Sequence, residues 1–286
     1  MRDNFVTTVS YGGKEVTAIN RPLIMGILNV TPDSFSDGGK NMGVANALRA
    51  CEKLVKDGAD IIDIGGESTR PGSVPVSAEE ELSRIYKVTD EVLKEFDVMV
   101  SVDTYKAEVA SEVLKLGAHI VNDVTALNGD SEMASLMARN SDRGIVLMRN
   151  GKLSLSSESS ESSECAGGKN ACFDEITSEI DANIDLALSS GILKSQILID
   201  PGIGFNTDRA ADLKLIEYTG KATGNYEFPY LFAVSRKRIT DYMLGGNSDF
   251  EKRDDLTAKL NQTAYMEGAS IVRTHNVRKY FELLGE

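Results

Sequence analysis

The chain has 286 residues, of which 41% are hydrophobic, and its 44 acidic and 31 basic side chains give a net charge of −13 at pH 7. A chain of this size can bury a large core, in one α/β barrel or in two small domains. The acidic balance argues against a general nucleic-acid surface, so anionic substrates would need locally placed Arg and Lys side chains. No shift in composition divides the chain, and we predict a single domain over residues 1–286.

Targeting and redox features predict a cytoplasmic protein. The N-terminal stretch MRDNFVTTVSYGGKE lacks the apolar core of a signal peptide, and no apolar run approaches the roughly 18 residues that a membrane span needs. The cysteines have no CxxC spacing, which suits a reducing compartment; they are Cys51, Cys165 and Cys172. With only His119 and His275 to assist them, a cysteine-based metal site is a poor interpretation.

Short apolar runs alternate with amphipathic segments along the chain. The apolar runs predict eight strands, at residues 23–30, 60–66, 98–104, 119–124, 144–148, 197–202, 231–235 and 270–275. Apolar residues at i, i+3 and i+4 predict helices between them, such as residues 45–59, 78–96, 106–118 and 173–191. This alternation implies a parallel sheet covered by helices, and eight such units indicate a (β/α)8 TIM barrel. Because periodicity cannot show closure, a doubly wound open sheet is the alternative.

Two segments fall outside this alternation. Residues 6–19 alternate in polarity and carry a Gly-Gly turn, which predicts a small N-terminal β-hairpin that plugs the bottom of the barrel. Residues 153–169, LSLSSESSESSECAGGK, are a low-complexity stretch whose Ser and Glu content cannot bury a core. We interpret this stretch as a mobile excursion after the fifth barrel strand.

Polar and charged residues follow the apolar runs at their C-terminal ends. In a barrel the loops after the strands share one mouth, where reactive groups are expected. A single Asp or Asn at a strand end is more often a turn former or helix cap. Convergence of so many polar strand ends on one mouth nevertheless favours a functional site. The residues are Asn29, Glu67, Ser68, Thr69, Arg70, Asp103, Asn122, Asp123, Asp200, Ser235, Arg236, Lys237, Arg273 and His275.

Three of these residues offer hydrogen-bond acceptors and an amide. Asp103, Asn122 and Asp200 suit a flat heterocycle with N–H donors, in a pocket whose other walls are aliphatic. Asp103 ends a strand that contains Val100 and Val102, and a carboxylate in such a place needs partners.

Four further residues offer positive charge or N–H donors. Arg70, Arg273, His275 and Lys237 suit a phosphate or diphosphate, which an Arg side chain binds bidentately. Together, the two sets indicate a heterocycle that carries an anionic leaving group.

Two long polar loops lie at the same mouth. NVTPDSFSDGG (29–39) and GGESTRPGSVPVS (65–77) have no amphipathic face to bury. Loops of that length are usually functional lids or disordered. A lid would exclude water from a cationic intermediate, and a solvated connection is the alternative.

These loops and the strands before them carry a resemblance to a known family. LIMGILNVTPDSFSDGG and DIIDIGGESTRPGS strongly resemble the two signature regions of the dihydropteroate synthases of folate biosynthesis. The later blocks of that family are matched in order over essentially residues 20–280, by VSVDTYKAEVA, HIVNDV, ILIDPGIGF, AVSRK and VRTH. The resemblance implies a transferase that condenses 6-hydroxymethyl-7,8-dihydropterin diphosphate with 4-aminobenzoate to 7,8-dihydropteroate and diphosphate. It also implies a homodimeric barrel, Mg2+ bound with the diphosphate, and sulfonamides as mimics of the aminobenzoate.

The resemblance implies a role for each matching residue. The pterin would be bound by Asp103, Asn122, Asp200, Phe205 and Lys237. The diphosphate would be bound by Asn29, Arg70, Arg273 and His275, with Asn29 as the Mg2+ ligand. The aminobenzoate would lie near Thr69, Arg70, Pro71 and Ser235. Catalysis would rest on Asp103, Arg273, His275 and Lys237, which stabilise the electron-poor pterin and the charge on the leaving oxygens.

Several positions depart from the family's pattern. The family commonly has a His-Met pair after the fifth strand, a Gly-Lys pair after DPGIGF and later an Asn, a Ser after SRK, and a His-Asp pair after the eighth strand. This chain instead has Arg149 and Asn150, Asn206 and Thr207, Asp212, Arg238, and Asn276. The pterin and diphosphate contacts are retained, so we predict an enzyme, with room for an altered rate or amine preference. A catalytically silent pterin-binding paralogue is the alternative. A pterin-dependent methyltransferase domain is a further one, but it would lack the two loop signatures.

Overall fold

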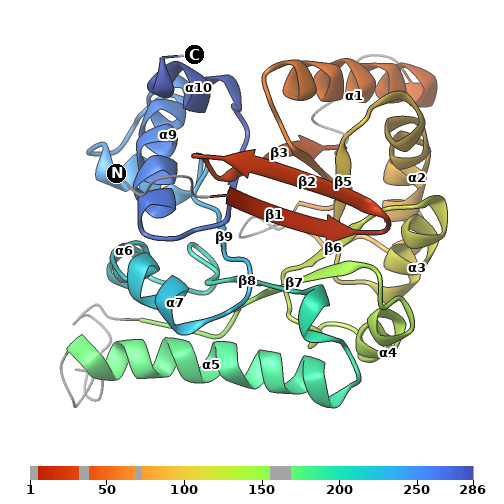
Figure 1. The fold of residues 1–286 in the computed structure, drawn as a ribbon. Helices are drawn as coiled ribbons and strands as arrows, with labels where there is room; N and C mark the ends of the chain where they lie inside the picture. The colour runs from red at the N-terminus through yellow and green to blue at the C-terminus, as the bar shows by residue number, and fades with distance from the viewer. Residues whose placement is uncertain (1–5, 32–38, 69–72, 155–168, 286) are drawn as a thin grey trace.

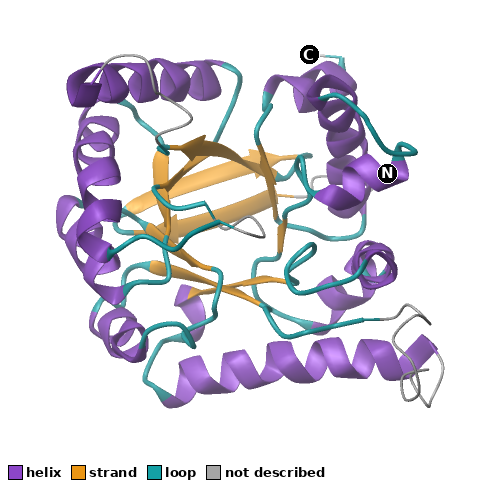
Figure 2. Cartoon of the chain, turned by 180° about the vertical axis from the view of Figure 1, so that it is seen from behind, coloured by secondary structure: helices purple, strands orange, loops and turns teal. Residues whose placement is uncertain are grey.

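The computed structural model describes residues 6–31, 39–68, 73–154 and 169–285, and its centre is an eight-stranded parallel sheet ringed by helices (Figures 1 and 2). The sheet strands are β3 (Leu23–Asn29), β4 (Ile61–Gly65), β5 (Met99–Asp103), β6 (Ile120–Asp123), β7 (Gly144–Met148), β8 (Ile197–Asp200), β9 (Leu231–Phe232) and β10 (Ile271–Thr274). The helices are α1 (Gly39–Lys56), α2 (Ala78–Glu95), α3 (Ala107–Leu116), α4 (Ser131–Arg139), α5 (Lys169–Ser189), α6 (Arg209–Glu217), α7 (Thr219–Asn225), α8 (Arg238–Met243), α9 (Phe250–Met266) and α10 (Arg278–Leu284). All eight predicted strands are present.

The sheet is nearly closed into a barrel. Its strands follow the order β8-β7-β6-β5-β4-β3-β10-β9, and each neighbouring pair is parallel. The two end strands meet through one isolated parallel bridge between Ile199 and Tyr230, beside a 3.0 Å hydrogen bond from the Ile199 amide to the Pro229 carbonyl. The TIM-barrel prediction is therefore confirmed, and the open doubly wound sheet is wrong. We call the β8–β9 junction the seam.

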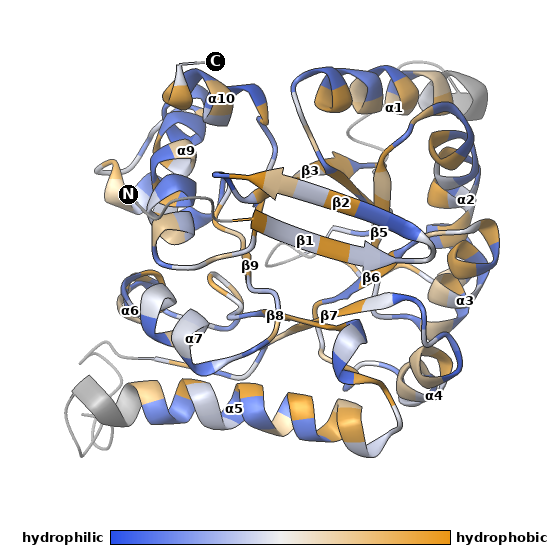
Figure 3. Ribbon diagram, viewed as in Figure 1, coloured by the Kyte–Doolittle hydropathy of each residue, from blue (hydrophilic) through white to orange (hydrophobic). Residues whose placement is uncertain are grey.

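Alternate side chains of the strands face the inside of the barrel and the surrounding helices. The outward residues join the helices in one large apolar cluster, which includes Ile62, Val100, Val121 and Ile145. Hydropathy colouring shows β7 and β8 as mainly apolar, whereas the helices carry polar and apolar residues side by side (Figure 3). The helices therefore cover an apolar sheet with one face and meet solvent with the other.

An N-terminal hairpin covers one end of the barrel. Strands β1 (Val6–Tyr11) and β2 (Lys14–Ile19) pair antiparallel across Gly12 and Gly13, which both have positive φ. Val9 and Tyr11 pack in one cluster with the lower inward side chains of the barrel, among them Leu23, Met25, Ile61, Met99, Ile120 and Leu198. The hairpin lies across this end in Figure 1. The predicted plug is thus confirmed, and it leaves the C-terminal ends of the strands as the open mouth.

Helix boundaries follow local signals in part. Helix α2 begins after Ser77, whose hydroxyl accepts a 3.1 Å hydrogen bond from the Glu80 amide, as an N-cap does. Helix α1 begins at Gly39, six residues before the predicted start at residue 45. Its first turn carries no apolar period, so periodicity could not reveal it. None of the helices in the described ranges combines the length and apolar character that crossing a bilayer needs.

Three predicted features fall on residues outside the described ranges. They are most of the Ser-rich stretch 153–169, the centre of the loop 29–39, and residues 69–72 of the loop 65–77. The described beginning of the Ser-rich stretch, residues 153 and 154, contacts the segment before α6. Leu153 is buried and forms a bridge with Thr207, and the Ser154 hydroxyl hydrogen-bonds Asp208 at 2.5 Å.

Candidate active site

The sequence-predicted polar residues gather where the strands end at the open mouth. Strand β3 ends in Asn29, β5 in Asp103 and β8 in Asp200, and Asn122 lies one residue before the end of β6. They share the inward-facing register of the residues that pack inside the barrel below them. The fold therefore brings residues from distant parts of the sequence to one site.

Arg273 of β10 connects two carboxylates across the mouth. Its Nη2 donates to Asp103 at 2.9 Å, and its Nε donates to Asp63 at 2.7 Å. The Arg273 and Asp103 side chains are 17% and 12% exposed, so the group is mostly removed from water but still reachable. Burial lowers the pKa of Arg273, but the two carboxylates outweigh this effect and raise it. The guanidinium thus stays charged at the base of the site.

Asp63 is a member of the site that the sequence analysis missed. It is fully buried in the middle of β4, and its Oδ2 also accepts a 3.0 Å hydrogen bond from the side-chain Nδ2 of Asn122. One carboxylate therefore holds both a predicted pterin-binding amide and the predicted diphosphate-binding Arg273. A signal was available, because a carboxylate inside the apolar run DIIDIGG needs partners as much as Asp103 does.

A second group surrounds the turn after β8. Asp200 is 4% exposed and accepts a 2.7 Å hydrogen bond from the Gly202 amide. The Lys237 ammonium lies 4.7 Å from the centre of the Phe205 ring and donates to the Ile203 carbonyl at 2.5 Å. Gly204 makes this approach possible, because an added Cβ would lie 3.0 Å from Lys237 Cδ. The predicted pterin-binding residues Asp200, Phe205 and Lys237 therefore lie around one turn.

Ser235 and His275 meet at the junction of β9 and β10. The Ser235 hydroxyl lies 3.0 Å from His275 Nδ1 and also accepts a 3.1 Å hydrogen bond from the His275 amide. These two contacts fix the imidazole relative to the end of β9. Ser235, predicted for the aminobenzoate, and His275, predicted for the diphosphate, thus lie in direct contact.

Gly65 lies beside the side-chain oxygens of Asn29 and Asp103. An added Cβ at Gly65 would lie 3.9 Å from Asn29 Oδ1 and 3.8 Å from Asp103 Oδ2. Side-chain oxygens of this kind suit Mg2+, which keeps several waters and commonly binds one or two protein groups together with substrate phosphates. Within the described ranges, no cluster of three His, Cys, Asp or Glu side chains is arranged to hold a metal ion. The donor set therefore fits a cation that is shared with a substrate.

Burial brings two ionisations of the site close to neutral pH. Burial raises the pKa of Asp103 to about 7, against the lowering effect of Arg273, and the carboxylates of Asp63, Glu81 and Asp123 raise it further. Burial lowers the pKa of Lys237 to about 8, while Asp200 opposes the shift. Burial also raises the pKa of Asp200.

Two acidic strand ends have structural roles instead. Asp123 accepts hydrogen bonds from the Thr125 and Leu127 amides, both at 2.8 Å, and so builds the turn after β6. Glu67 is bound by the Lys106 ammonium and by the Tyr105 hydroxyl, the latter at 3.1 Å. Asp123 is therefore a turn former, as a single Asp at a strand end most often is.

Five of the departures from the family pattern have local partners in the loops after β7 and β8. Arg149 is 1% exposed; its side chain donates to the Pro201 and Gly151 carbonyls at 3.1 and 2.9 Å and pairs with Glu179 at 2.7 Å. Asp212 accepts hydrogen bonds from the Gly204 amide at 2.7 Å and the Thr207 hydroxyl at 2.5 Å. The Asn206 amide donates to the Asn150 carbonyl at 2.8 Å. These residues brace the loops after β7 and β8.

The predicted site is described in part. Asn29, Asp103, Asn122, Asp200, Phe205, Ser235, Lys237, Arg273 and His275 lie at or beside the mouth. Thr69, Arg70 and Pro71 lie outside the described residues. The roles assigned to all these residues stay predictions.

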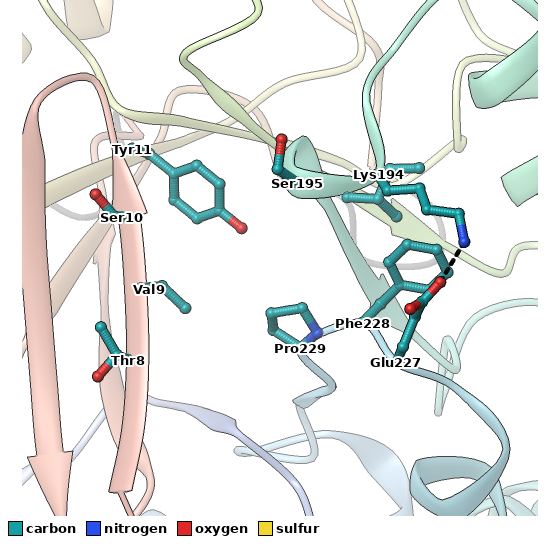
Figure 4. A pocket seen from close by; sticks show the side chains of 10 residues that line it. Thr8, Val9, Ser10, Tyr11, Lys194, Ser195, Glu227, Phe228 and Pro229 are labelled. Carbon is teal, nitrogen blue, oxygen red and sulfur yellow. Dashed lines mark hydrogen bonds and ion pairs between the residues drawn. The ribbon is translucent and has the colours of Figure 1, made fainter.

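The barrel also has a cleft at the hairpin end, of about 300 Å³ (Figure 4). It lies between β1 and the segments before β8 and β9, and the Tyr11 ring projects toward it. Its charged residues Lys194 and Glu227 pair with each other. The predicted site residues lie at the other end of the barrel, so we assign no chemistry to this cleft.

Comparison with known proteins identifies the family. Residues 25–275 match the model of the pterin binding enzymes. A dihydropteroate synthase of Streptococcus pyogenes serotype M6 is 40% identical over 255 residues, which cover 89% of this chain and 90% of that protein. A Clostridium difficile dihydropteroate synthase, solved in the presence of pteroic acid, has a TM-score of 0.82, 35% identity and 95% coverage of both chains. A Xanthomonas albilineans dihydropteroate synthase, solved with 4-aminobenzoic acid, has a TM-score of 0.84, 32% identity and coverage of 98% of this chain and 96% of that one. This chain therefore belongs to the dihydropteroate synthase family of pterin binding enzymes.

Proposed function

We propose that this chain condenses 6-hydroxymethyl-7,8-dihydropterin diphosphate with 4-aminobenzoate to give 7,8-dihydropteroate and diphosphate. The observation that carries the proposal is the bridge made by Arg273 between Asp63 and Asp103. Through this bridge, a buried cation suited to a leaving diphosphate is joined to the carboxylate and amide groups suited to a pterin. One mouth therefore holds the two parts of the same substrate.

In the reaction, the bond between the pterin methylene carbon and the diphosphate oxygen breaks, and a bond from that carbon to the amine nitrogen forms. The oxygen leaves with the electron pair, and the amine loses one proton to solvent. Arg273 and His275 would stabilise the charge that accumulates on the diphosphate. Asp103 would stabilise the electron-poor pterin, while Asn122, Asp200 and Lys237 hold its polar edge. The mouth would hold the weakly nucleophilic arylamine beside Ser235.

Asn29 would hold Mg2+ together with the diphosphate, and the place of its Oδ1 beside Gly65 at the mouth supports this assignment. When bound, the ion would neutralise negative charge on the leaving group. A diphosphate titration with and without Mg2+ tests the assignment, because Asn29→Ala should weaken the Mg2+-dependent part of binding only.

The proposed reaction is tested by diphosphate release from purified protein, with pterin diphosphate and Mg2+, in the presence and absence of 4-aminobenzoate. Amine-dependent release with formation of dihydropteroate is the expected result. Pterin binding without release would contradict the proposal and would favour the silent paralogue.

Three further features belong to the same proposal. A homodimer is tested by light scattering of the purified protein, and cytoplasmic localisation by cell fractionation. Inhibition by sulfonamides is expected because they mimic the aminobenzoate. A competition experiment against 4-aminobenzoate tests that expectation directly.

A further inference from the structure

Helix α9 packs a polar face against the barrel. Its buried residues are Asp254, Thr257, Ala258, Asn261, Ala264 and Tyr265. Asp254 is only 3% exposed, and a buried carboxylate of this kind is costly unless charged or hydrogen-bonding partners surround it. Its partners therefore indicate what the residue does.

Asp254 binds two loops of the mouth with one carboxylate. Arg236, in the loop after β9, donates to it from Nε at 2.9 Å and from Nη2 at 2.7 Å. Asn276, in the loop after β10, donates to it from Nδ2 at 3.2 Å. The Arg236 guanidinium also lies 4.8 Å from the centre of the Phe250 ring at the start of the same helix. We call Asp254, Arg236 and Asn276 the Asp254 clamp.

The residues of the clamp are direct neighbours of predicted site residues. Arg236 stands between Ser235 and Lys237, and Asn276 follows His275. Arg236 adopts a φ of +56°, a left-handed conformation that is unfavourable for a side chain such as Arg and needs support from its surroundings. The bidentate bond to Asp254 provides that support. Loss of the bond would let this turn relax and move the Ser235 and Lys237 side chains.

The clamp also gives a physical reason for Asn276. An aspartate at this position would place a second carboxylate against Asp254 at the present 3.2 Å contact, and two such groups repel. The Asn276 amide instead donates a hydrogen bond. Asp254 therefore supplies from helix α9 the negative charge that a His-Asp pair would carry after β10.

We propose that Asp254, Arg236 and Asn276 are positioning residues, which hold Ser235, Lys237 and His275 in the geometry that the reaction needs. The inference deepens the proposed synthase function and rests on it. It predicts that the enzyme needs one negative charge in the clamp, at position 254 or at position 276. Activity should fall when both positions carry a carboxylate and when neither does.

A charge-exchange experiment tests the clamp. The variants are Asp254→Asn, Asn276→Asp and the double variant that carries both changes. Asp255→Asn is the matched control, because Asp255 is the next residue of α9, is 51% exposed and pairs only at the surface with Lys279, at 2.8 Å. For each protein, kcat and KM for both substrates, pterin diphosphate affinity by titration calorimetry, and the melting temperature are measured.

Each single variant should lower kcat/KM at least about tenfold, since small displacements of positioned groups cost that much or more. The double variant should be about tenfold more active than the product of the two single effects, because Asn276→Asp returns the negative charge that Asp254→Asn removes, although the bidentate bond to Arg236 stays lost. Asp255→Asn should stay within about twofold of wild type. This recovery is coupling that independent sites do not show. If the single variants lost activity because they fold poorly, the double variant would also have a lowered melting temperature, and its activity would not recover.

Two results would overturn the clamp. One is single variants that match the Asp255→Asn control, and the other is a double variant no more active than the product of the two single effects. If wild-type protein binds pterin diphosphate without turnover, the proposed function fails, and the same coupling is then read from the binding affinities. A wild type that neither binds nor reacts would remove both proposals together.

Discussion

Asp103 and Lys237 ionise close to neutral pH, and this sets the expected pH dependence of the reaction. The pKa of Asp103 is raised to about 7, so its negative charge is lost as the pH falls through that value. The pKa of Lys237 is lowered to about 8, so its positive charge is lost as the pH rises through that value. We expect a bell-shaped profile of kcat/KM with its maximum between the two values.

The acidic side of that profile is assigned by one substitution. Asp103→Asn should remove the acidic limb and lower turnover at least about 100-fold, the effect expected for losing a key electrostatic group. Rates are measured from about pH 6 to about pH 9 in one mixed buffer of constant ionic strength. A wild-type profile that is flat over this range would contradict the assignment.

Asp63 should matter almost as much as the residues it holds. Asp63→Asn weakens the grip on Arg273, so kcat/KM should fall at least about tenfold. The acidic limb should also move to lower pH, because the Asp63 charge raises the pKa of Asp103. A merely structural role would leave that limb in place. Steady-state kinetics over the same pH range measures both effects.

Ser101→Ala is the control for Asp63→Asn. Ser101 pairs with Asp63 in the β4–β5 register, is fully buried, and its hydroxyl has no hydrogen-bond partner among the described residues. Its removal should change kcat/KM by no more than about twofold. Equal losses in the two variants would contradict a specific role for Asp63.

The sequence revealed those site residues that end an apolar strand with a polar group. Asp103 and Asp200 were recognisable in this way. Asp63 was not, because it lies inside a strand, and Asp254 was not, because its partners come from loops that only the fold brings to α9. Contacts between residues that are far apart in the sequence produce no local spacing pattern by which they could be recognised.

At the scale of elements, the hairpin should contribute to stability without touching the chemistry. Tyr11 is 5% exposed and its ring lies against Gly144, where an added Cβ would come within 3.1 Å. Tyr11→Ala should lower the free energy of unfolding by about 3–5 kcal/mol. Turnover per folded molecule should not change, because the mouth is at the other end of the barrel.

Val6→Ala on the same strand is the control, because Val6 is 52% exposed. Its cost should be no more than about 0.5 kcal/mol, as for most surface changes. Urea unfolding followed by circular dichroism measures both variants. A loss of turnover in folded Tyr11→Ala protein would show that the plug influences the mouth.

The strands and helices were predictable to different degrees for a physical reason. The strands are apolar on both faces and stand out from the sequence, whereas α9 turns Asp254, Thr257 and Asn261 toward the barrel. A helix with a polar buried face lacks the apolar period by which helices are recognised. Strand β9 also shrank, from the predicted 231–235 to Leu231–Phe232, because only these residues pair in register with β10.

At the scale of the whole molecule, sequence periodicity predicted the number and direction of the strands but not the closure of the sheet. Closure depends on the contact between the first and last strands of the sheet order, which are β8 and β9. Ile199 and Tyr230 make that contact through one bridge. Nothing in their local sequence distinguishes a closed barrel from an open sheet.

The seam also has a consequence for the motions of the barrel. A junction with a single bridge should open locally at a lower free energy than the long β3–β4 and β4–β5 ladders. In hydrogen exchange, the amide of Ile199, which donates to the Pro229 carbonyl across the seam, should therefore exchange sooner than the amides of the β3–β4 and β4–β5 ladders. Asp200 is the last residue of β8 on one side of the seam, and Ser235 and Lys237 follow β9 on the other side. A ligand that contacts residues on both sides of the seam should slow this exchange. Bound substrate would then supply contacts between β8 and β9 that the protein itself lacks.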